Sequence, residues 1–218
     1  MKLLVATRST HKLGEIRSIL SVVPGLELVS LDEAGIPENP AVEDALEPYE
    51  TFEENAQSKA AHFRRVSGLP TVADDSGLEV DVLAGRPGVR SRRFAPVPEG
   101  TSREGQDRAN NEHLLDQLPL VEDPRCRTAR YVCVAALDEG EGSIPTFRGT
   151  AEGRILSAPR GSGGFGYDPL FLFPELDQTF AEIAAAEKDA RSHRGKAFRA
   201  LAAYLLERAG TPPDSPAR

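Results

Sequence analysis

Tryptophan is absent from this chain of 218 residues, and cysteine occurs only at Cys126 and Cys133. Two cysteines do not make the disulfide framework of a small secreted domain. Neither one has a cysteine or histidine at the spacing of a zinc ligand pair, which argues against a zinc site. Cys133 lies in an apolar run, and we expect it to be a small buried side chain.

Long apolar runs are missing as well. No stretch approaches the ~20 apolar residues that a membrane span needs. The apolar start at residues 2–6 resembles that of a signal peptide, but it ends at once in the polar residues 7–12. We therefore expect a cytoplasmic protein with no membrane partner.

Basic residues are in the minority, with 26 Lys and Arg against 34 Asp and Glu and a net charge of −8. A general affinity for DNA or RNA needs a broad basic face, so we expect no nucleic-acid partner. A free nucleotide needs only a few local cations and a metal ion. A basic pocket in an acidic protein is therefore the pattern to seek.

The apolar pattern alternates between the periods of strand and helix, which is typical of an α/β protein. It predicts strands at residues 2–6, 26–31, 71–73, 78–83, 129–137, 146–155 and 170–173, and helices at 12–23, 51–67, 107–118, 179–186 and 192–208. These signals together predict a mixed central sheet flanked by helices, with a cleft between two lobes. We expect one two-lobed domain over residues 1–209 and a disordered tail over the proline-rich residues 210–218.

Residues 7–12 precede the first expected helix and are the first of four segments that could carry function. A helix N-terminus offers free N–H groups that bind phosphate. Thr7 and Ser9 add hydroxyl groups, while Arg8 and Lys12 add positive charge. The alternative is an ordinary capped helix start with solvated basic residues, because every helix has an N-terminus.

The second segment is Asp74-Asp75-Ser76-Gly77, which follows an expected strand. Adjacent carboxylates at a strand end can hold Mg²⁺, and one of them can deprotonate a metal-bound water. Successive side chains on extended backbone point to opposite sides, so both carboxylates need not face one ligand. The alternative is a turn, because Asp, Ser and Gly are common turn residues.

The third segment, residues 161–168, combines four glycines with two aromatic residues and an acid. Glycines such as Gly166 let the backbone approach a ligand closely. Phe165 and Tyr167 are candidates to stack on a base, and Asp168 could accept a hydrogen bond from it. No Gly-Lys-Ser/Thr follows, so this is not a Walker P-loop. The alternative is a flexible loop.

The fourth segment joins Lys188 to the basic run Ser192-His193-Arg194-Gly195-Lys196 at the start of the last expected helix. Cations at a helix N-terminus oppose the helix macrodipole. Such a cluster is unfavourable unless an anion binds there, which favours a phosphate or nucleotide site. The alternative is a solvated basic patch.

Together these segments resemble the inosine triphosphate pyrophosphatase family, whose members act on non-canonical purine nucleoside triphosphates. Each matching motif is weak alone, but five in the same order between Lys2 and Leu206 are highly specific. They are Phe52-Glu53-Glu54-Asn55-Ala56 with Lys59-Ala60, Ala73-Asp74-Asp75-Ser76-Gly77-Leu78-Glu79-Val80, Pro87-Gly88-Val89 with Ser91 and Arg93, Gly163-Gly164-Phe165-Gly166-Tyr167-Asp168-Pro169, and Glu187-Lys188 with Ser192-His193-Arg194-Gly195.

The resemblance implies an α/β fold with a long mixed sheet and a deep cleft between two lobes, a homodimer, and Mg²⁺ as cofactor. It implies hydrolysis of ITP, dITP and XTP to the monophosphate and pyrophosphate. By the same resemblance, Asp75 activates the attacking water and lies near the metal, together with Glu47. The implied nucleotide contacts are Thr7, Arg8, Ser9, Lys12, Ser76, Phe165, Gly166, Tyr167, Asp168, Lys188, His193 and Arg194.

The chain departs from the family at its first loop, where the usual Thr-Gly-Asn is replaced by Thr7-Arg8-Ser9. The charge of Arg8 is a candidate to compensate. Glu43 and Glu50 compete with Glu47 for the metal. Two other functions stay open at this point: a pyrophosphatase for modified pyrimidine nucleotides, and a regulatory module that binds a nucleotide without cutting it. The paired acids argue against the second, since pure binding gains little from carboxylates near phosphate.

Overall fold

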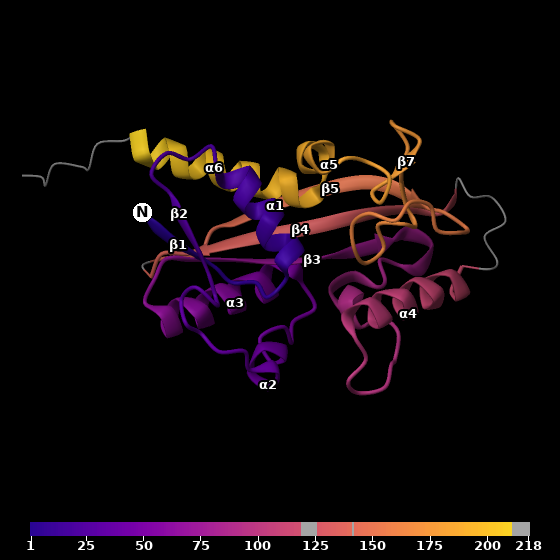
Figure 1. Cartoon of the computed structure of the whole chain (residues 1–218), viewed down its shortest axis with the longest axis horizontal. Helices are drawn as coiled ribbons and strands as arrows, with labels where there is room; N and C mark the ends of the chain where they lie inside the picture. The colour runs from indigo at the N-terminus through magenta and orange to yellow at the C-terminus, as the bar shows by residue number, and fades with distance from the viewer. Residues whose placement is uncertain (119–125, 141, 211–218) are drawn as a thin grey trace, which may run out of the picture.

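The computed structural model describes residues 1–118, 126–140 and 142–210, and its strands form one seven-stranded sheet in the order β2-β1-β3-β4-β5-β6-β7 (Figure 1). The strands are β1 (Lys2–Val5), β2 (Glu27–Ser30), β3 (Thr71–Val80), β4 (Thr128–Asp138), β5 (Thr146–Ile155), β6 (Phe171–Phe173) and β7 (Gln178–Thr179). The first three pair in parallel, and every later pair is antiparallel. The predicted mixed sheet is thus confirmed.

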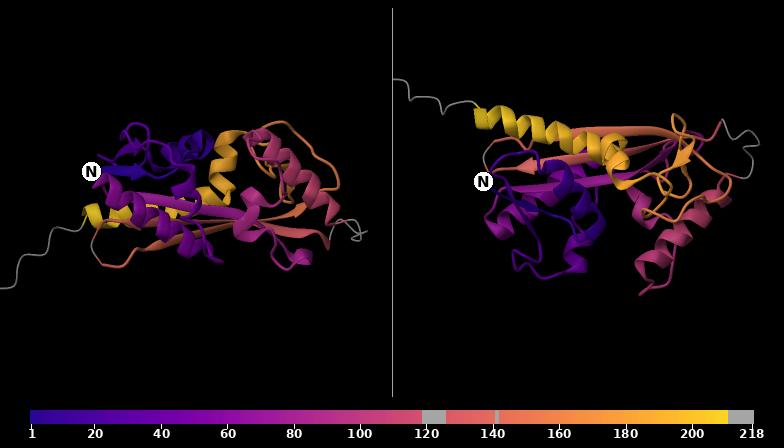
Figure 2. Two further views of the ribbon diagram at one scale, coloured as in Figure 1. Left: turned by 90° about the horizontal axis from the view of Figure 1, so that it is seen from below. Right: turned by 45° about the horizontal axis from the view of Figure 1, so that its top comes forward.

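Helices flank this sheet, as expected. They are α1 (Thr10–Leu20), α2 (Pro40–Asp44), α3 (Phe52–Ser67), α4 (Arg103–Asp116), α5 (Ala185–Arg191) and α6 (His193–Gly210), with short 3₁₀ helices η1 (Asp81–Leu83) and η2 (Gly88–Arg93). Helix α6 runs beside the long strands β4 and β5 in each view, while the α2–α3 segment and α4 project near opposite ends of these strands (Figures 1 and 2). None of the helices in the described ranges is long and apolar enough to span a membrane.

Strand β4 contributes to all three apolar clusters, because its side chains alternate between the two faces of the sheet. On one face, Cys133 packs with residues of α1 and α6, so the expectation of a buried cysteine is confirmed. On the opposite face, Val134 packs with residues of α3. Nearer the start of the strand, Ala129 packs with Leu114 of α4 and with the aromatic residues around Phe171. Strand β4 therefore connects the three apolar clusters of the described residues.

Local sequence sets the helix ends. The N-cap at Thr51 is confirmed, because Thr51 Oγ1 accepts from the N–H of Glu54 at 3.2 Å. The Glu54 carboxylate accepts from the Thr51 hydroxyl at 2.5 Å, in place of the main-chain N–H that a full capping box would use. Helix α3 ends at Gly68, whose φ of +73° is a conformation that glycine adopts without strain. Helix α1 begins two residues before the prediction, because the Ser9 side chain caps it by accepting from the N–H of Lys12.

One alternative is excluded and two predictions are wrong. The strand predicted over residues 78–83 ends at Val80, because residues 81–83 form η1, and the helix predicted over residues 179–186 is not formed. Residues 74–77 form no turn: they lie inside β3, which pairs with β4 without a break from Thr71↔Asp138 to Val80↔Ala129. The apolar partner strand supplies the full ladder, which overrides the turn propensity of Asp, Ser and Gly. Residues 179–186 do not form one helix either. Strand β7 takes Thr179, the N–H of Phe180 donates to the carbonyl of Phe171, and α5 begins only at Ala185.

The edge of β3 is open for a short distance beside the end of β1. The parallel pairing with β1 stops at Val72, whose carbonyl accepts from the N–H of Ala6. From Leu78 onward the edge is covered again, since the N–H of Leu78 donates to Ser91 Oγ in η2. Residues 74–76 occupy the gap between these two coverings. This gap is the place where side chains from several elements reach the strand.

The end of the chain was predicted to be a helix over residues 192–208 and a disordered tail over residues 210–218. Helix α6 continues to Gly210, one residue into the predicted tail. Residues 211–218 lie outside the described residues, and so the disordered tail stays a prediction. The single domain over residues 1–209 also stays a prediction.

Candidate functional site

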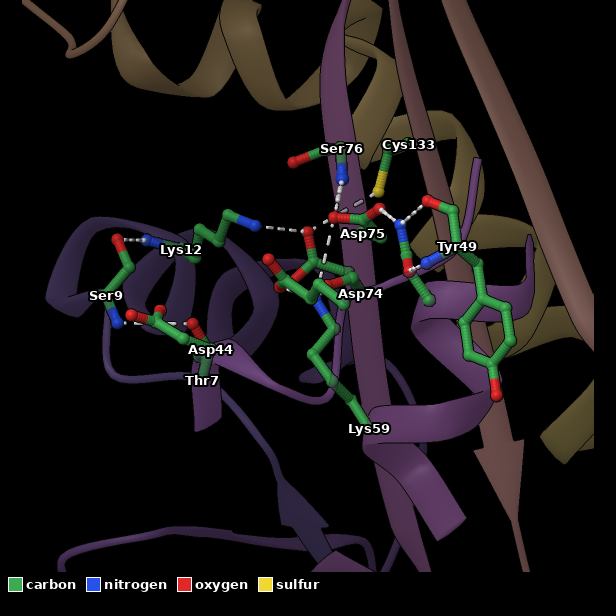
Figure 3. A network of polar contacts seen from close by, with 12 residues as sticks. Thr7, Ser9, Lys12, Asp44, Tyr49, Lys59, Asp74, Asp75, Ser76 and Cys133 are labelled. Atoms are coloured by element: carbon green, nitrogen blue, oxygen red, sulfur yellow. Dashed lines mark hydrogen bonds and ion pairs between the residues drawn. The ribbon is translucent and has the colours of Figure 1, made fainter. Parts of the chain in front are cut away.

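Asp74 and Asp75 lie at the open edge of β3 and face opposite sides of the sheet. Asp74 is on the side of α1 and α6, where its Oδ2 lies 2.9 Å from Lys12 Nζ. Asp75 is on the side of α3, where its Oδ2 accepts from Asn55 Nδ2 at 3.1 Å. Figure 3 shows Lys12 and Lys59 approaching the pair from different directions. The expectation that the two acids need not share a ligand fits this geometry.

Charged side chains of alternating sign extend from Asp74 across the α1 and α6 side. We call this row the charge chain, and every side chain in it is less than one-fifth exposed. Its members in spatial order are Lys12, Asp74, Arg194, Glu15, Lys188 and Asp168. Three cations and three anions balance, which lets so many charges be buried together.

The inner half of the charge chain centres on Arg194. Its guanidinium lies 3.5 Å from the carboxylate of Asp74, donates to Ser76 Oγ at 3.0 Å, and donates to Glu15 at 2.5 Å. Burial alone would raise the pKa of Asp74, but Lys12 and Arg194 hold it well below its usual range. The carboxylate therefore stays ionised and holds both cations in place.

The outer half of the charge chain centres on Lys188. Its ammonium donates to Asp168 Oδ2 at 2.6 Å and lies 3.3 Å from Glu15 Oε1. It also lies 4.9 Å from the centre of the Phe165 ring, close enough for a cation–π contact. The structure thus brings predicted residues of the third and fourth segments together with Lys12 of the first.

A second group of charges surrounds Asp75 on the α3 side. Lys59 Nζ donates to Glu47 Oε1 at 2.7 Å and to the main-chain oxygen of Asp74 at 2.6 Å, and it lies 3.6 Å from Asp75 Oδ1. Burial raises the pKa of Asp75, although Lys59 opposes the effect. A carboxylate with a raised pKa is the better proton acceptor.

Among the three competing glutamates, the structure places only Glu47 beside Asp75. Glu43 instead pairs with Arg8, with 2.9 Å between Nη2 and Oε1, and the exposed Glu50 pairs with Arg90. Arg8 also donates to Asp32 and to the carbonyls of Ile36 and Pro37. Its side chain therefore fixes the segment around the start of α2 through internal partners. The contact of Arg8 with a nucleotide stays a prediction.

The glycine-rich segment presents Phe165 to the charge chain. The ring stacks on His11 of α1 with 5.5 Å between centroids, and it also lies against Lys188 and Arg194. Tyr167, by contrast, is 4% exposed in the apolar core and donates its hydroxyl to the carbonyl of Ser91, and its stacking on a base stays a prediction. The tyrosine ring belongs to the apolar cluster that contains Leu170 and Phe171.

Asp168 and His193 are buried beneath the site. The carboxylate of Asp168 accepts from the N–H of Phe165 and pairs with Lys188, and it receives the hydroxyl of Tyr131 at 3.3 Å. The His193 ring stacks on the Tyr131 ring at 4.6 Å, and burial moves its pKa well below the usual value. Asp168 therefore holds Phe165 and Lys188 in position, whereas the nucleotide contacts predicted for Asp168 and His193 stay predictions.

Thr7 and Ser9 shape the first loop. The N–H of Ser9 donates to Thr7 Oγ1 at 3.2 Å, and Ser9 is the cap of α1. Their contact with a nucleotide stays a prediction.

Four residues of the site have no role in the sequence-based hypothesis: Lys59, Asn55, Glu15 and His11. For Asn55 and Lys59 a signal was present, since both fall in a family motif and are spaced four apart on one helix face. Glu15 and His11 carried no comparable signal.

Comparison with known proteins identifies a family that covers most of the chain. Residues 3–204 match the model of the Ham1 family. A dITP/XTP pyrophosphatase of Frankia alni is 48% identical over 95% of this chain and 98% of its own length, and one of Geobacter sulfurreducens is 45% identical over 94% and 96%. The structure of a HAM1 protein from Coxiella burnetii superposes with a TM-score of 0.81, at 34% identity over 95% of this chain and 99% of that one. The chain therefore belongs to the Ham1 family.

Proposed function

We propose that this protein hydrolyses non-canonical purine nucleoside triphosphates (ITP, dITP and XTP) to the monophosphate and pyrophosphate. One observation carries the proposal: Asp75, a buried carboxylate with a raised pKa, lies at the same open strand edge as the balanced charge chain. Its relatives from Frankia alni and Geobacter sulfurreducens are named as dITP/XTP pyrophosphatases. An enzyme of this kind clears the nucleotide pool of deaminated purines.

The charge chain is the binding device for a polyanion. In the chain as described, the cations Lys12 and Lys188 are compensated by internal carboxylates. A triphosphate exchanges some of these internal partners for its own oxygens, so the side chains need little reorganisation to bind it. Neutralising the phosphates also lowers the repulsion of the attacking water and stabilises the pyrophosphate that leaves.

Asp75 takes the proton of the attacking water. Asn55 orients the carboxylate through Oδ2, and the N–H of Ser76 donates to Oδ1 at 3.1 Å. With both oxygens oriented from the protein side, the carboxylate has a fixed direction in which to accept a proton. Attack at the α-phosphorus then breaks the bond between the α- and β-phosphates, and the proton resides on Asp75 until it is returned to solvent.

The donor set beside Asp75 fits Mg²⁺. Glu47 and Asp75 already share one cation, the ammonium of Lys59, so two carboxylates converge on a common point. Mg²⁺ is usually bound by one or two carboxylates, several waters and the substrate phosphates. The part of the chain that the structure describes contains no group of three or more His, Cys, Asp or Glu arranged for a metal. When bound, Mg²⁺ supplies charge neutralisation at the phosphates.

Selection of the base depends on the Phe165 ring and on Arg194. The ring offers a stacking surface, and the guanidinium carries donors suited to a 6-oxo group. Inosine and xanthosine present an oxygen at that position, whereas adenosine presents an amino donor. Two donors facing each other leave hydrogen bonds unmade, which disfavours ATP strongly.

A nucleotide panel with separate pyrophosphate and phosphate readouts tests the proposal. We expect ITP, dITP and XTP to give the monophosphate and pyrophosphate, and ATP to be cut far more slowly. Release of IDP and orthophosphate would place the cut at the wrong bond. Preference for modified pyrimidine triphosphates would replace the substrate class, and uncut nucleotide after long incubation with Mg²⁺ would leave a binding module.

The same resemblance supports two further proposals, a homodimer and a cytoplasmic location. Light scattering on the purified protein checks the first, with a mass of twice 23.5 kDa expected. Fractionation of the source cells checks the second.

A further inference from the structure

The loop residue Gly166 is held by two side chains of α4, a helix that the sequence analysis connected with no function. The N–H of Gly166 donates to Asp107 Oδ2 at 3.0 Å, and its carbonyl accepts from Asn111 Nδ2 at 3.0 Å. Asp107 and Asn111 are four residues apart, so they project from one face of α4. At this spacing the Asp107 carboxylate accepts from the N–H of Gly166, and the Asn111 amide donates to the carbonyl of the same residue.

The preceding residue, Phe165, is held from the other side of the loop. Its N–H donates to Asp168 Oδ2 at 3.0 Å, and its carbonyl accepts from the N–H of Asp168 at 3.2 Å. All four main-chain polar groups of Phe165 and Gly166 are therefore bonded. Gly166 adopts a φ of +60°, a left-handed conformation that glycine adopts without steric strain.

The consequence of these bonds is a fixed direction for the Phe165 ring. The ring meets His11 of α1, Lys188 of α5 and Arg194 of α6, so side chains from three helices already touch it. Those contacts act on the ring alone, whereas α4 acts on the main chain next to it. Figure 2 shows α4 beside the loops that follow β5, at one end of the molecule.

We infer that Asp107 and Asn111 are positioning residues for base recognition: they fix the Gly166 peptide groups and thereby hold the Phe165 ring where a purine base stacks. This inference rests on the proposed function, because it assigns the ring to the base. It separates two parts of substrate binding. Binding of the phosphates depends on Lys12 and Lys188 of the charge chain. Stacking of the base depends on the Phe165 ring, which the bonds from α4 hold in place.

A tryptophan reporter tests the positioning without any need for activity. The chain contains no tryptophan, so a Phe165→Trp variant has a single tryptophan, on the loop, whose emission is excited apart from that of the four tyrosines. In this background, Asp107→Ala removes the acceptor for Gly166, and we expect faster acrylamide quenching and lower anisotropy. Asp107→Asn keeps an acceptor oxygen and is expected to restore the parent values. Glu112→Ala, an exposed site on the same helix, is the matched control.

Kinetics on the chain with native Phe165 provide the second readout. Loss of one or two hydrogen bonds in Asp107→Ala and Asn111→Ala should raise KM for ITP about three- to tenfold. We expect kcat and the inhibition constant of pyrophosphate to stay within about twofold, because pyrophosphate engages only the phosphate groups of the site. Glu112→Ala should change none of these values.

Several outcomes would overturn the inference. Equal quenching of the introduced tryptophan with Asp107 and with Asp107→Ala would show that α4 does not hold the loop. An inhibition constant for pyrophosphate that rises as much as KM would show general loosening of the site. If the native chain cuts no ITP, the proposed function fails, and the tryptophan readout still decides whether α4 fixes the loop.

Discussion

Asp74 and Asp75 are neighbours in the chain, yet one is bonded to Lys12 on the α1 side of the sheet and the other to Asn55 on the α3 side. Strand alternation separates them, and the open edge of β3 lets both be reached by charged groups. The pair therefore divides its work: Asp74 organises cations, and Asp75 is left to accept a proton.

This division predicts that Asp75→Asn keeps the fold and loses turnover. The amide cannot accept the proton of the attacking water, and we expect kcat for ITP to fall by about 10²- to 10⁴-fold. Circular dichroism should match that of the native protein, and Asp116→Asn at the end of α4 serves as control. Near-normal turnover would remove Asp75 from the mechanism.

Asp74→Ala should act mainly on stability. It leaves Lys12 and Arg194 buried without the carboxylate that lies 2.9 Å and 3.5 Å from them. Breaking a buried ion pair by removing one partner costs roughly 3–5 kcal/mol of unfolding free energy. Urea unfolding measures the loss. Lys2→Ala, which breaks an exposed pair, should cost about 0–1 kcal/mol, and a similar loss in both variants would contradict the prediction.

The buried His193 should make the fold sensitive to acid. Burial lowers its folded pKa well below the ordinary value, so the folded chain keeps the ring neutral while the unfolded chain takes up a proton. The contribution of His193 to the free energy of unfolding is fully present above the unfolded pKa of about 6.5. It decreases by about 1.4 kcal/mol for each pH unit below that value, until the lowered pKa of the folded chain is reached.

His193→Phe tests this contribution, because a phenyl ring keeps the stack on Tyr131 and does not titrate. Urea unfolding on either side of about pH 6.5 should show a smaller acid loss in the variant than in the native chain. Identical pH profiles in the two chains would mean that His193 contributes nothing to acid sensitivity.

Chelation should stop turnover without unfolding the chain. The two carboxylates near Lys59 form an open donor set, so the fold does not depend on Mg²⁺ for its core. We expect EDTA to abolish ITP hydrolysis, added Mg²⁺ to restore it, and the melting temperature to change little. Full activity in EDTA would refute the metal proposal.

Gly77 should tolerate no side chain. A Cβ there would lie 2.3 Å from the carbonyl oxygen of Gly88 and 2.6 Å from Ser91 Oγ, so η2 would have to move away from β3. We expect Gly77→Ala to cost about 1–3 kcal/mol by overpacking. Gly14→Ala is the matched control, because its Cβ meets nothing within 4 Å and an alanine in a helix gains about 0.5–1 kcal/mol. Thermal melts that shift equally for both would contradict this account.

The sequence by itself determined much of the fold and several members of the site. The N-cap at Thr51, the stop at Gly68 and the strand over residues 129–137 depend on short-range propensities and on apolar period, and each is confirmed within a few residues. Lys12, Lys188 and Arg194 were also predicted, and the structure brings them into one row.

Only the tertiary structure decided how these residues are paired. Lys12 meets Asp74 across 62 positions, and Arg194 meets Glu15 across 179, so no local pattern encodes either contact. The strand continues through Asp75, where the sequence also allowed a turn, because β4 supplies a continuous hydrogen-bonding partner. Long-range packing sets these outcomes: a side chain's partner depends on which elements the folded core places beside it, and not on its neighbours in the chain.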